Sequence, residues 1–296
     1  MTRRGPIDVF GQAFQNPILL AAGTAGFGHE LAGVIDLDRL GGIVTKAVSP
    51  EPRAGNPAPR VAEFSGGMLN AVGLANPGLD QVASVELPWL AENVKRAKVI
   101  VNVVGFAVAD YPMVVGRLDS HDVVTAFELN VSCPNTDRGG EEFGADSDVL
   151  TDLVRRCRDA TSRPLVVKLA PTLTDMAGTA AAAAEAGADG ISVVNTIPGT
   201  LFRFDEETDG DPQARLGFGR GGVSGPALLA VGVLATRQVK ERTGLPVIGV
   251  GGVRTLTDVE QYLAAGASLV AVGTAAMADP RVPERLVSEW EAQWQS

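Results

Sequence analysis

Histidine and cysteine, which carry much of enzyme chemistry, are scarce in this sequence. The 296 residues include two histidines and two cysteines. His29 and His121 lie far apart in the sequence, so the chain has few residues from which a zinc site or a Ser-His-Asp triad could be built. Cys133 and Cys157 belong to no Cys-X-X-Cys pattern and cannot form a disulfide framework. We therefore expect neither a bound metal ion nor a disulfide-stabilised fold.

The chain also lacks an excess of basic residues and any long apolar run. Its 25 Lys and Arg residues face 35 Asp and Glu residues, which gives a formal net charge of -10 and a pI of about 4.8. Nucleic acids and anionic membranes require clustered Lys and Arg, so both are disfavoured as partners. No run approaches the ~20 apolar residues of a membrane span, and no apolar segment follows the basic N-terminus. We expect a cytoplasmic protein with a soluble, small-molecule substrate.

The sequence instead alternates short apolar runs with helical stretches. The runs are continuous, as expected of parallel strands that are buried on both faces. Helices are expected at 175–186, 226–242 and 255–265, each of which ends close to a glycine. Eight strand-helix units in a chain of this length predict an α/β fold, a (β/α)8 TIM barrel, in a single domain over 1–296. The expected strands are 18–22, 42–46, 99–104, 126–130, 165–169, 190–194, 247–250 and 269–273.

Two segments are longer than ordinary barrel loops. Residues 49–78 contain five prolines and five glycines, and we expect them to cross the barrel mouth with a small hairpin. Residues 197–222 include the acidic cluster 205–211 and are too polar for a core. Long loops in compact domains tend to be lids or partner surfaces, and both segments are interpreted in this way.

Polar side chains gather where the predicted strands end. The active site of a (β/α)8 barrel lies at the C-terminal ends of its strands. Buried lysines and asparagines are costly without partners, so several that converge on one mouth predict a bound polar ligand. Any one of them alone could instead satisfy a helix end or the backbone. They are Lys46, Asn102, Asn130, Lys168, Asn195 and Thr196.

Cys133 follows the fourth predicted strand, where the catalytic loop of a barrel begins. Pro134 fixes the chain direction just after the thiol and disfavours helical geometry at Cys133. The alternative is a cysteine that merely packs at a strand end. A thiol on this loop could remove a proton from a substrate.

The seventh and eighth predicted strands end in Gly249-Val250-Gly251-Gly252 and Gly273-Thr274, and a helix is expected to start after each. Barrels often bind phosphate after these strands, because glycine backbone N–H groups and helix N-termini can approach it. The glycines at 221–225 could add to the same pocket; the alternative is that tight turns alone require them. The spacing is not that of a Rossmann fingerprint. A phosphate pocket, a barrel lysine, several asparagines and a loop thiol together predict a phosphorylated cofactor that lies above a flat, hydrogen-bonding substrate, and FMN fits best.

A series of short motifs runs through nearly the whole chain: Ala-Ala-Gly-Thr-Ala-Gly-Phe-Gly at 21–28, Thr-Lys at 45–46, Gly-Asn-Pro at 55–57, Gly-Met-Leu-Asn-Ala-Val-Gly-Leu at 67–74, Asn-Pro-Gly at 76–78, Asn-Val-Ser-Cys-Pro-Asn at 130–135, Val-Lys-Leu at 167–169, Asn-Thr at 195–196, Gly-Gly-Val-Ser-Gly-Pro at 221–226, Gly-Val-Gly-Gly-Val at 249–253 and Gly-Thr at 273–274. In this order they resemble the class 1 dihydroorotate dehydrogenases, and within them the type 1B catalytic subunits. Cys133 distinguishes the chain from class 2 enzymes, which use serine as the base. The glycines at 139–140 and 144 are more similar to type 1B than to type 1A.

The resemblance implies oxidation of (S)-dihydroorotate to orotate in de novo pyrimidine (UMP) biosynthesis. Cys133 would be the general base that takes the C5 proton while a hydride leaves C6 for N5 of FMN. An unperturbed thiol has a pKa of about 8.5, so turnover is expected to rise with pH until Cys133 ionises. The implied substrate-binding residues are Lys46, Asn70, Ala71, Val72, Gly73, Leu74, Asn130, Asn195 and Thr196.

The resemblance also implies which residues bind FMN, with Lys168 beside the flavin to stabilise its anionic reduced form. This cofactor-binding set is Gly23, Lys46, Ala47, Asn102, Asn130, Lys168, Val194, Gly225, Gly251, Gly252, Gly273 and Thr274.

A homodimer of catalytic subunits is implied, each with a partner subunit that carries FAD and a 2Fe-2S cluster and passes electrons to NAD. The two cysteines of this chain cannot ligate a cluster that needs four. The chain departs from the family pattern in two places. The acidic residues 205–211 replace a basic segment, and Leu228-Leu229 stands where a lysine is usual. The first departure puts the electron acceptor in question.

There are three alternatives. A phosphate-sugar isomerase on the same barrel is disfavoured, because it would usually require a carboxylate or histidine base at the mouth and no predicted strand ends in one. A dihydropyrimidine dehydrogenase-like flavoprotein would share the fold, flavin and catalytic cysteine but act on uracil or thymine, which lack the carboxylate expected to meet Lys46. A flavin-binding relay subunit without catalysis is disfavoured by the presence of Cys133, Lys46 and the asparagines.

Overall fold

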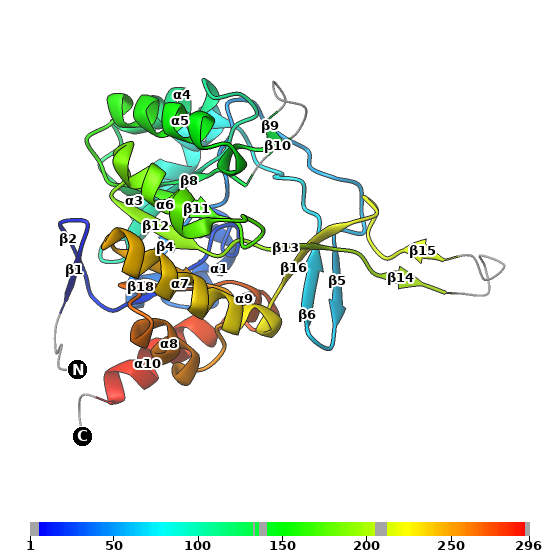
Figure 1. The fold of residues 1–296 in the computed structure, drawn as a ribbon. Helices are drawn as coiled ribbons and strands as arrows, with labels where there is room; N and C mark the ends of the chain where they lie inside the picture. Colours follow the sequence, from blue (N-terminus) through cyan, green and yellow to red (C-terminus); the bar gives the residue numbers. More distant parts are fainter. Residues whose placement is uncertain (1–5, 133, 136–140, 205–211, 294–296) are drawn as a thin grey trace.

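The barrel is the centre of the molecule. The computed structural model describes residues 6–132, 134–135, 141–204 and 212–293. Within these ranges, eight parallel strands close into a barrel with a ring of helices around it (Figure 1). The predicted (β/α)8 fold is thus confirmed, with four of the eight strands one or two residues shorter than expected and β8 two residues longer. Around the barrel the strands are β3 (Ile18–Leu20), β4 (Gly42–Val44), β7 (Lys98–Val103), β8 (Val124–Asn130), β11 (Leu165–Leu169), β12 (Gly190–Val193), β17 (Val247–Val250) and β18 (Leu269–Val272).

The helices follow the strands along the chain. They are α1 (His29–Ala32), α2 (Leu79–Gln81), α3 (Leu87–Asn93), α4 (Asp110–Leu118), α5 (Ser147–Ala160), α6 (Met176–Glu185), α7 (Leu229–Thr243), α8 (Leu256–Ala264), α9 (Thr274–Ala278) and α10 (Val282–Ala292). The three predicted helices correspond to α6, α7 and α8. Thr255 begins α8 as an N-cap, with its side chain accepting from the backbone N–H of Asp258. In the described part of the chain, no helix combines the length and apolar character that crossing a membrane would demand.

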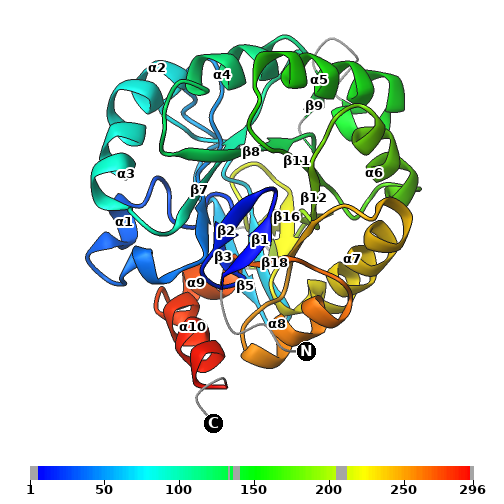
Figure 2. The ribbon, with the colours of Figure 1, turned by 90° about the vertical axis from the view of Figure 1, so that its left-hand side faces the viewer.

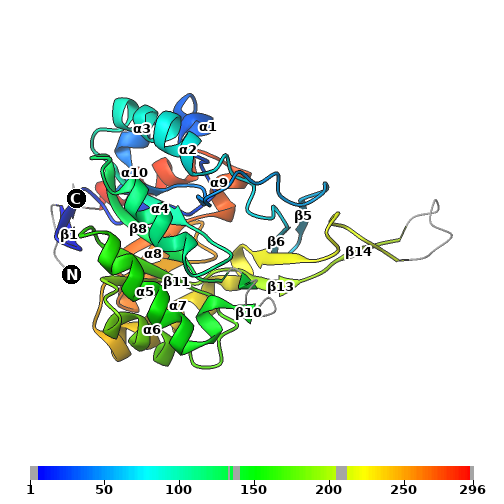
Figure 3. The same ribbon diagram turned by 90° about the horizontal axis from the view of Figure 1, so that it is seen from above.

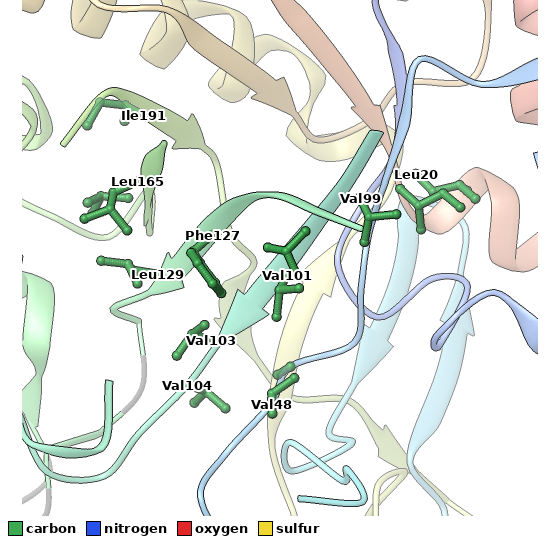
Figure 4. Close-up of a cluster of buried hydrophobic side chains, with 14 of the residues drawn as sticks. Leu20, Val48, Val99, Val101, Val103, Val104, Phe127, Leu129, Leu165 and Ile191 are labelled. Atoms are coloured by element: carbon green, nitrogen blue, oxygen red, sulfur yellow. The ribbon is translucent and has the colours of Figure 1, made fainter. Parts of the chain in front are cut away.

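Each barrel strand has two buried faces. Val101 and Val103 of β7 and Leu129 of β8 belong to the outer cluster, which lies between strands and helices (Figure 4). Ile100 and Ala126 belong to a second cluster, in the barrel interior. Successive side chains of a strand point to opposite faces, and here both faces are apolar. This explains why the strands read as continuous apolar runs in the sequence.

A hairpin that the sequence did not predict covers the N-terminal end of the barrel. Strands β1 (Ile7–Val9) and β2 (Gln12–Phe14) pair antiparallel and lie across the opening (Figure 2). Phe10 and Gly11 both have positive φ, 58° and 69°, as the two central residues of a type I′ turn require. Phe14 is fully buried and packs into the interior cluster. The apolar interior is therefore covered at this end.

The two long insertions meet at the opposite end. Strands β5 (Val61–Phe64) and β6 (Gly67–Asn70) form the expected hairpin, and β16 (Gly221–Ser224) pairs with β6 and with β13 (Ile197–Gly199), giving the sheet order β13-β16-β6-β5. A small core of Ala62, Leu69, Ala71 and Leu216 lies in this region. Beyond it, the short strands β14 (Phe202–Arg203) and β15 (Gln213–Ala214) project away from the barrel (Figure 3). The remaining described strands are β9 (Pro134–Asn135) and β10 (Glu141–Glu142).

Cys157 is fully buried in α5, and burial raises the pKa of its thiol from 9.0 to about 12. When the pH exceeds its ordinary pKa, this thiol ionises in the unfolded chain but stays protonated in the folded chain. A raised folded-state pKa means that stability is complete below pH 9 and falls as pH rises. Between pH 8 and pH 10 we expect the protein to lose about 1.4 kcal/mol of unfolding free energy through this group. Urea unfolding at both pH values, compared with Cys157→Ala, measures the effect; equal losses in the two proteins would contradict it.

Candidate active site

A layer of polar side chains lies inside the barrel, toward the C-terminal ends of its strands. Asn102, Glu128, Lys168 and Ser192 come from β7, β8, β11 and β12, which are consecutive around the barrel. Asn102 is in register with Glu128, and Lys168 with Ser192. They continue the inner faces that begin with residues such as Ile100 and are 1%, 1%, 7% and 0% exposed, respectively. The interior thus changes from apolar to polar one layer below the mouth.

Glu128 and Lys168 form a buried ion pair in this layer. Lys168 Nζ lies 3.5 Å from Glu128 Oε1. The side chain of Asn102 donates a hydrogen bond of 2.7 Å from Nδ2 to the same oxygen. The backbone N–H of Asn102 donates in turn to Thr45 Oγ1, at 3.2 Å. Burying a charge is costly unless it is paired and hydrogen-bonded, and here both conditions are met for the carboxylate.

Other buried polar atoms of this region have no hydrogen-bond partner among the residues that the structure describes. They are Asn102 Oδ1, Ser192 Oγ and Ser132 Oγ. Buried polar groups in native proteins nearly always have hydrogen-bond partners. Asn102 and Ser192 belong to the polar layer itself, so their free atoms are what a polar ligand in the barrel would use.

Two amide side chains meet at the ends of β8 and β12. Asn195 Nδ2 donates to Asn130 Oδ1 at 3.3 Å, and the backbone N–H of Thr196 donates to Asn195 Oδ1 at 2.8 Å. The hydroxyl of Tyr111, which is fully buried, donates to the carbonyl of Asn130 at 2.8 Å. The base of the loop after β8 is thereby fixed from two sides. Cys133, on this loop, lies outside the described residues.

Lys46 lies just beyond β4. Its backbone N–H donates to the carbonyl of Gly26 at 2.8 Å, and its own carbonyl accepts from Thr45 Oγ1 at 2.9 Å. The backbone is thus held on both sides, while the side chain is half-buried and the following Ala47 is buried. Among the residues that the structure describes, none forms an ion pair or hydrogen bond with the Lys46 ammonium group. This cation can therefore meet an anionic ligand.

The predicted substrate segment, Asn70 to Leu74, begins at the end of β6. Asn70 Nδ2 donates to the carbonyl of Gly222 on β16 at 3.2 Å. Gly73 and Leu74 have left-handed backbones, with φ of 73° and 58°. Asn56 fixes the intervening residues, since its Nδ2 donates to the carbonyl of Ala71 and its backbone N–H to that of Val72. The segment is therefore an ordered turn that is tied to both insertions.

The glycines after β17 form a tightly packed turn. Gly251 has φ of +121°, and a Cβ atom there would lie 3.4 Å from Val194 Cγ2, which places these two predicted cofactor residues side by side. At Gly252, with φ of +78°, a Cβ atom would lie 2.6 Å from the backbone N of Leu229. The hydroxyl of Tyr262 in α8 donates to the carbonyl of Gly251 at 2.7 Å. Both glycines are thus required by conformation and packing.

The glycine before α7 meets the chain after β18. Gly225 has φ of +98°, and a Cβ atom there would lie 3.5 Å from Thr274 Cγ2. Thr274 Oγ1 donates to Ser224 Oγ at 2.8 Å. At Gly23, after β3, a Cβ atom would meet no atom within 4 Å, and at Gly273 it would lie 3.5 Å from Ala21 Cβ. The predicted phosphate-binding segments are therefore neighbours, with open space at Gly23.

The sequence reasoning missed three residues of this region, namely Glu128, Tyr111 and Tyr262. Glu128 had a visible signal, because it is a lone carboxylate in the middle of an apolar strand that is buried on both faces. The two tyrosines had none, since their hydroxyls reach carbonyl groups on other elements.

Comparison with known proteins shows the family of this chain. The family model described as dihydroorotate dehydrogenase matches residues 6–293. The chain is 44% identical over 283 residues to the dihydroorotate dehydrogenase B (NAD(+)) catalytic subunit of Listeria monocytogenes serotype 4b, which covers 96% of this chain and 91% of the relative. The proteins of the same name from Geobacillus kaustophilus and Bacillus caldolyticus are each 43% identical over 286 residues, which is 97% of this chain and 89% of theirs. The chain belongs to the dihydroorotate dehydrogenase family.

Proposed function

We propose that this chain catalyses the oxidation of (S)-dihydroorotate to orotate in pyrimidine biosynthesis, as an FMN-dependent catalytic subunit whose electrons pass to NAD. The observation that carries the proposal is the buried polar layer in the barrel. The otherwise apolar interior contains a lysine, a glutamate and two polar groups that have no hydrogen-bond partner among the described residues. Such a group of buried polar side chains is expected where a polar ligand binds. The family match and the relatives named dihydroorotate dehydrogenase B (NAD(+)) support the choice of reaction.

FMN suits the residues at this end of the barrel. The unsatisfied Asn102 Oδ1, the Lys168 ammonium and the Asn130 amide offer hydrogen bonds to a flat heterocycle. The phosphate would be held by backbone groups of Gly225, Gly251, Gly252, Gly273 and Thr274, of which Gly225 and Thr274 lie side by side. Gly23, Lys46, Ala47 and Val194 complete the proposed site. When bound, FMN supplies the acceptor for the hydride that leaves C6 of the substrate.

The chain's own residues are proposed to position the substrate and remove its proton. The Lys46 ammonium meets the carboxylate of dihydroorotate. Asn130, Asn195 and Thr196 and the turn from Asn70 to Leu74 bind the pyrimidine edge, because their amide and backbone groups match its alternating donors and acceptors. Cys133 takes the proton from C5 at its Sγ atom.

The relatives are named catalytic subunits, a name that implies a second subunit. We propose that this chain also works with a partner that carries FAD and a 2Fe-2S cluster, and that two catalytic subunits form a dimer in the cytoplasm. The acidic residues 205–211 lie outside the described residues.

The purified full chain tests the reaction directly. We expect a yellow protein whose flavin absorbance bleaches when dihydroorotate is added without oxygen. A flavin that bleaches with dihydrouracil and not with dihydroorotate would favour the pyrimidine-reducing alternative. A protein that binds no flavin would overturn the proposed function.

Tyr262→Phe removes one hydroxyl behind the glycine turn and leaves the ring in place. The carbonyl of Gly251 then loses its 2.7 Å hydrogen bond. A net hydrogen bond contributes about 1 kcal/mol, so we expect the dissociation constant for FMN to rise about fivefold. Titration of the FMN-free protein with FMN, followed by flavin fluorescence, measures it. A dissociation constant equal to that of the wild type would refute a role for the Tyr262 hydroxyl in FMN binding.

A further inference from the structure

We propose that Glu128 is a positioning residue that sets the charge of the flavin site: its carboxylate offsets the Lys168 ammonium and thereby limits how strongly the protein favours reduced over oxidised FMN. The inference rests on the proposed function, because it requires that FMN binds in this barrel. It concerns a residue in the same polar layer as Asn102 and Lys168 that is not itself among the proposed ligand-binding groups.

The placement of charge in the protein singles out this pair. Three charged side chains are buried in the described ranges, namely Glu86, Glu128 and Lys168. Two of them form the ion pair inside the barrel, at 3.5 Å. Glu86 lies elsewhere, on the segment between α2 and α3, where it contacts His29 at 2.9 Å. The buried side chains of the described barrel interior thus include one positive and one negative charge, and the net charge of this pair is zero; the half-buried Lys46 adds its charge at the mouth.

Packing alone does not account for Glu128. The inner positions one layer below are filled by Ile100, Ala126 and Val166, which need no partners. A buried ion pair is often no more stable than apolar side chains of similar volume, because both charges lose their hydration. An apolar residue at 128 would therefore fill the barrel at least as well, but it would leave Lys168 as an uncompensated cation.

Glu128 is also held in one arrangement. Its Oε1 atom accepts from Asn102 Nδ2 at 2.7 Å while facing Lys168 Nζ. The residue is 1% exposed, so solvent does not screen its charge as it would at a surface. The carboxylate is therefore a fixed negative charge, and any ligand that approaches Lys168 experiences both groups together.

The direction of the effect follows from the charge of reduced FMN. Two-electron reduction with uptake of one proton adds a negative charge to the flavin, which a nearby cation stabilises and a nearby anion destabilises. Lys168 without Glu128 would favour the reduced form more strongly. Electrons that arrive from dihydroorotate must leave again for the acceptor, and a flavin that is held too firmly in its reduced form releases them poorly. Glu128 thus allows the flavin both to accept electrons from dihydroorotate and to pass them on to the acceptor.

Glu128→Gln is the sharpest test, because glutamine retains the oxygen that accepts from Asn102 and loses only the charge. We expect the ratio of FMN affinities, reduced over oxidised, to rise at least tenfold, which is an upward shift of about 30 mV in a two-electron midpoint potential. The measurement uses the full chain loaded with FMN, titrated without oxygen against a dye of known potential. Since a chemical reductant drives the titration, it does not depend on activity with any substrate.

Two further variants separate charge from structure. Glu128→Asp keeps the charge, so its potential should stay closer to that of the wild type than the potential of Glu128→Gln does. Glu86→Gln removes the other buried carboxylate, outside the barrel, and should leave the potential unchanged. If Glu128 merely held Lys168 in place, neutralising Glu128 would let the lysine move away from the flavin. The midpoint potential would then fall.

An unchanged or lowered potential in Glu128→Gln would overturn the inference while leaving the proposed function intact. A wild-type chain that binds FMN but is not reduced by dihydroorotate would instead overturn the proposed substrate, and the potentials would still decide the role of Glu128. A chain that binds no FMN would overturn both.

Discussion

Replacement of Cys133 by alanine is expected to abolish the reduction of bound flavin by dihydroorotate while leaving the flavin in place. Alanine cannot accept the C5 proton, and loss of a general base typically slows a reaction by about 10²-fold to 10⁴-fold. The thiol is not among the groups proposed to hold FMN, so the yellow colour should persist. Stopped-flow measurement of flavin bleaching without oxygen gives the rate, and the absorbance before mixing gives the bound flavin.

The chain provides its own control for this experiment. Cys157 is the second of its two cysteines, is fully buried in α5, and has a pKa raised to about 12, so it forms no thiolate at working pH. Cys157→Ala should bleach at the wild-type rate, and the wild-type rate should rise with pH until Cys133 ionises. Bleaching at an unchanged rate in Cys133→Ala would show that another group takes the proton.

Replacement of Lys168 by methionine is expected to destabilise the protein by about 3–5 kcal/mol, because it leaves Glu128 as a buried and unpaired charge. Methionine has a similar length and no charge, so the loss of packing is small. The pair is 3.5 Å apart, and its members are 1% and 7% exposed. Urea unfolding of the FMN-free protein, analysed at constant m-value, measures the change.

The double variant Lys168→Met/Glu128→Gln provides the matched comparison. With both charges removed, the glutamine still accepts from Asn102, and most of the lost stability should return. The two substitutions should therefore be strongly non-additive, as expected of residues in direct contact. Equal destabilisation in the single and double variants would mean that the methionine itself, and not the unpaired carboxylate, is responsible.

Local sequence was sufficient to predict the barrel. The eight strands follow from continuous apolar runs that are buried on both faces, and this pattern needs no knowledge of distant contacts. Strand ends were less certain, as at residues 18–22, where β3 covers Ile18–Leu20. The residues that follow the last hydrogen-bonded position of this strand are as apolar as the strand itself. Composition alone therefore predicts that the strand ends later than it does.

Features that depend on distant pairing could not be predicted in this way. The β1–β2 hairpin has strands of three residues, too short for a clear alternation. The ion pair between Glu128 and Lys168 depends on the register of β8 against β11. The sheet at the mouth joins Asn70 to Gly222, which are 152 positions apart. Each of these is set by tertiary contacts that the residue types around it do not encode.

Strand β16 has a consequence for how the protein fills its site. Its four residues connect Gly222, which accepts from Asn70 in the proposed substrate turn, to Ser224, which accepts from Thr274 in the proposed phosphate pocket. A ligand that orders one end of so short a strand also orders the other end. Cofactor and substrate would then strengthen each other's binding, and by thermodynamic reciprocity the factor must be the same in both directions.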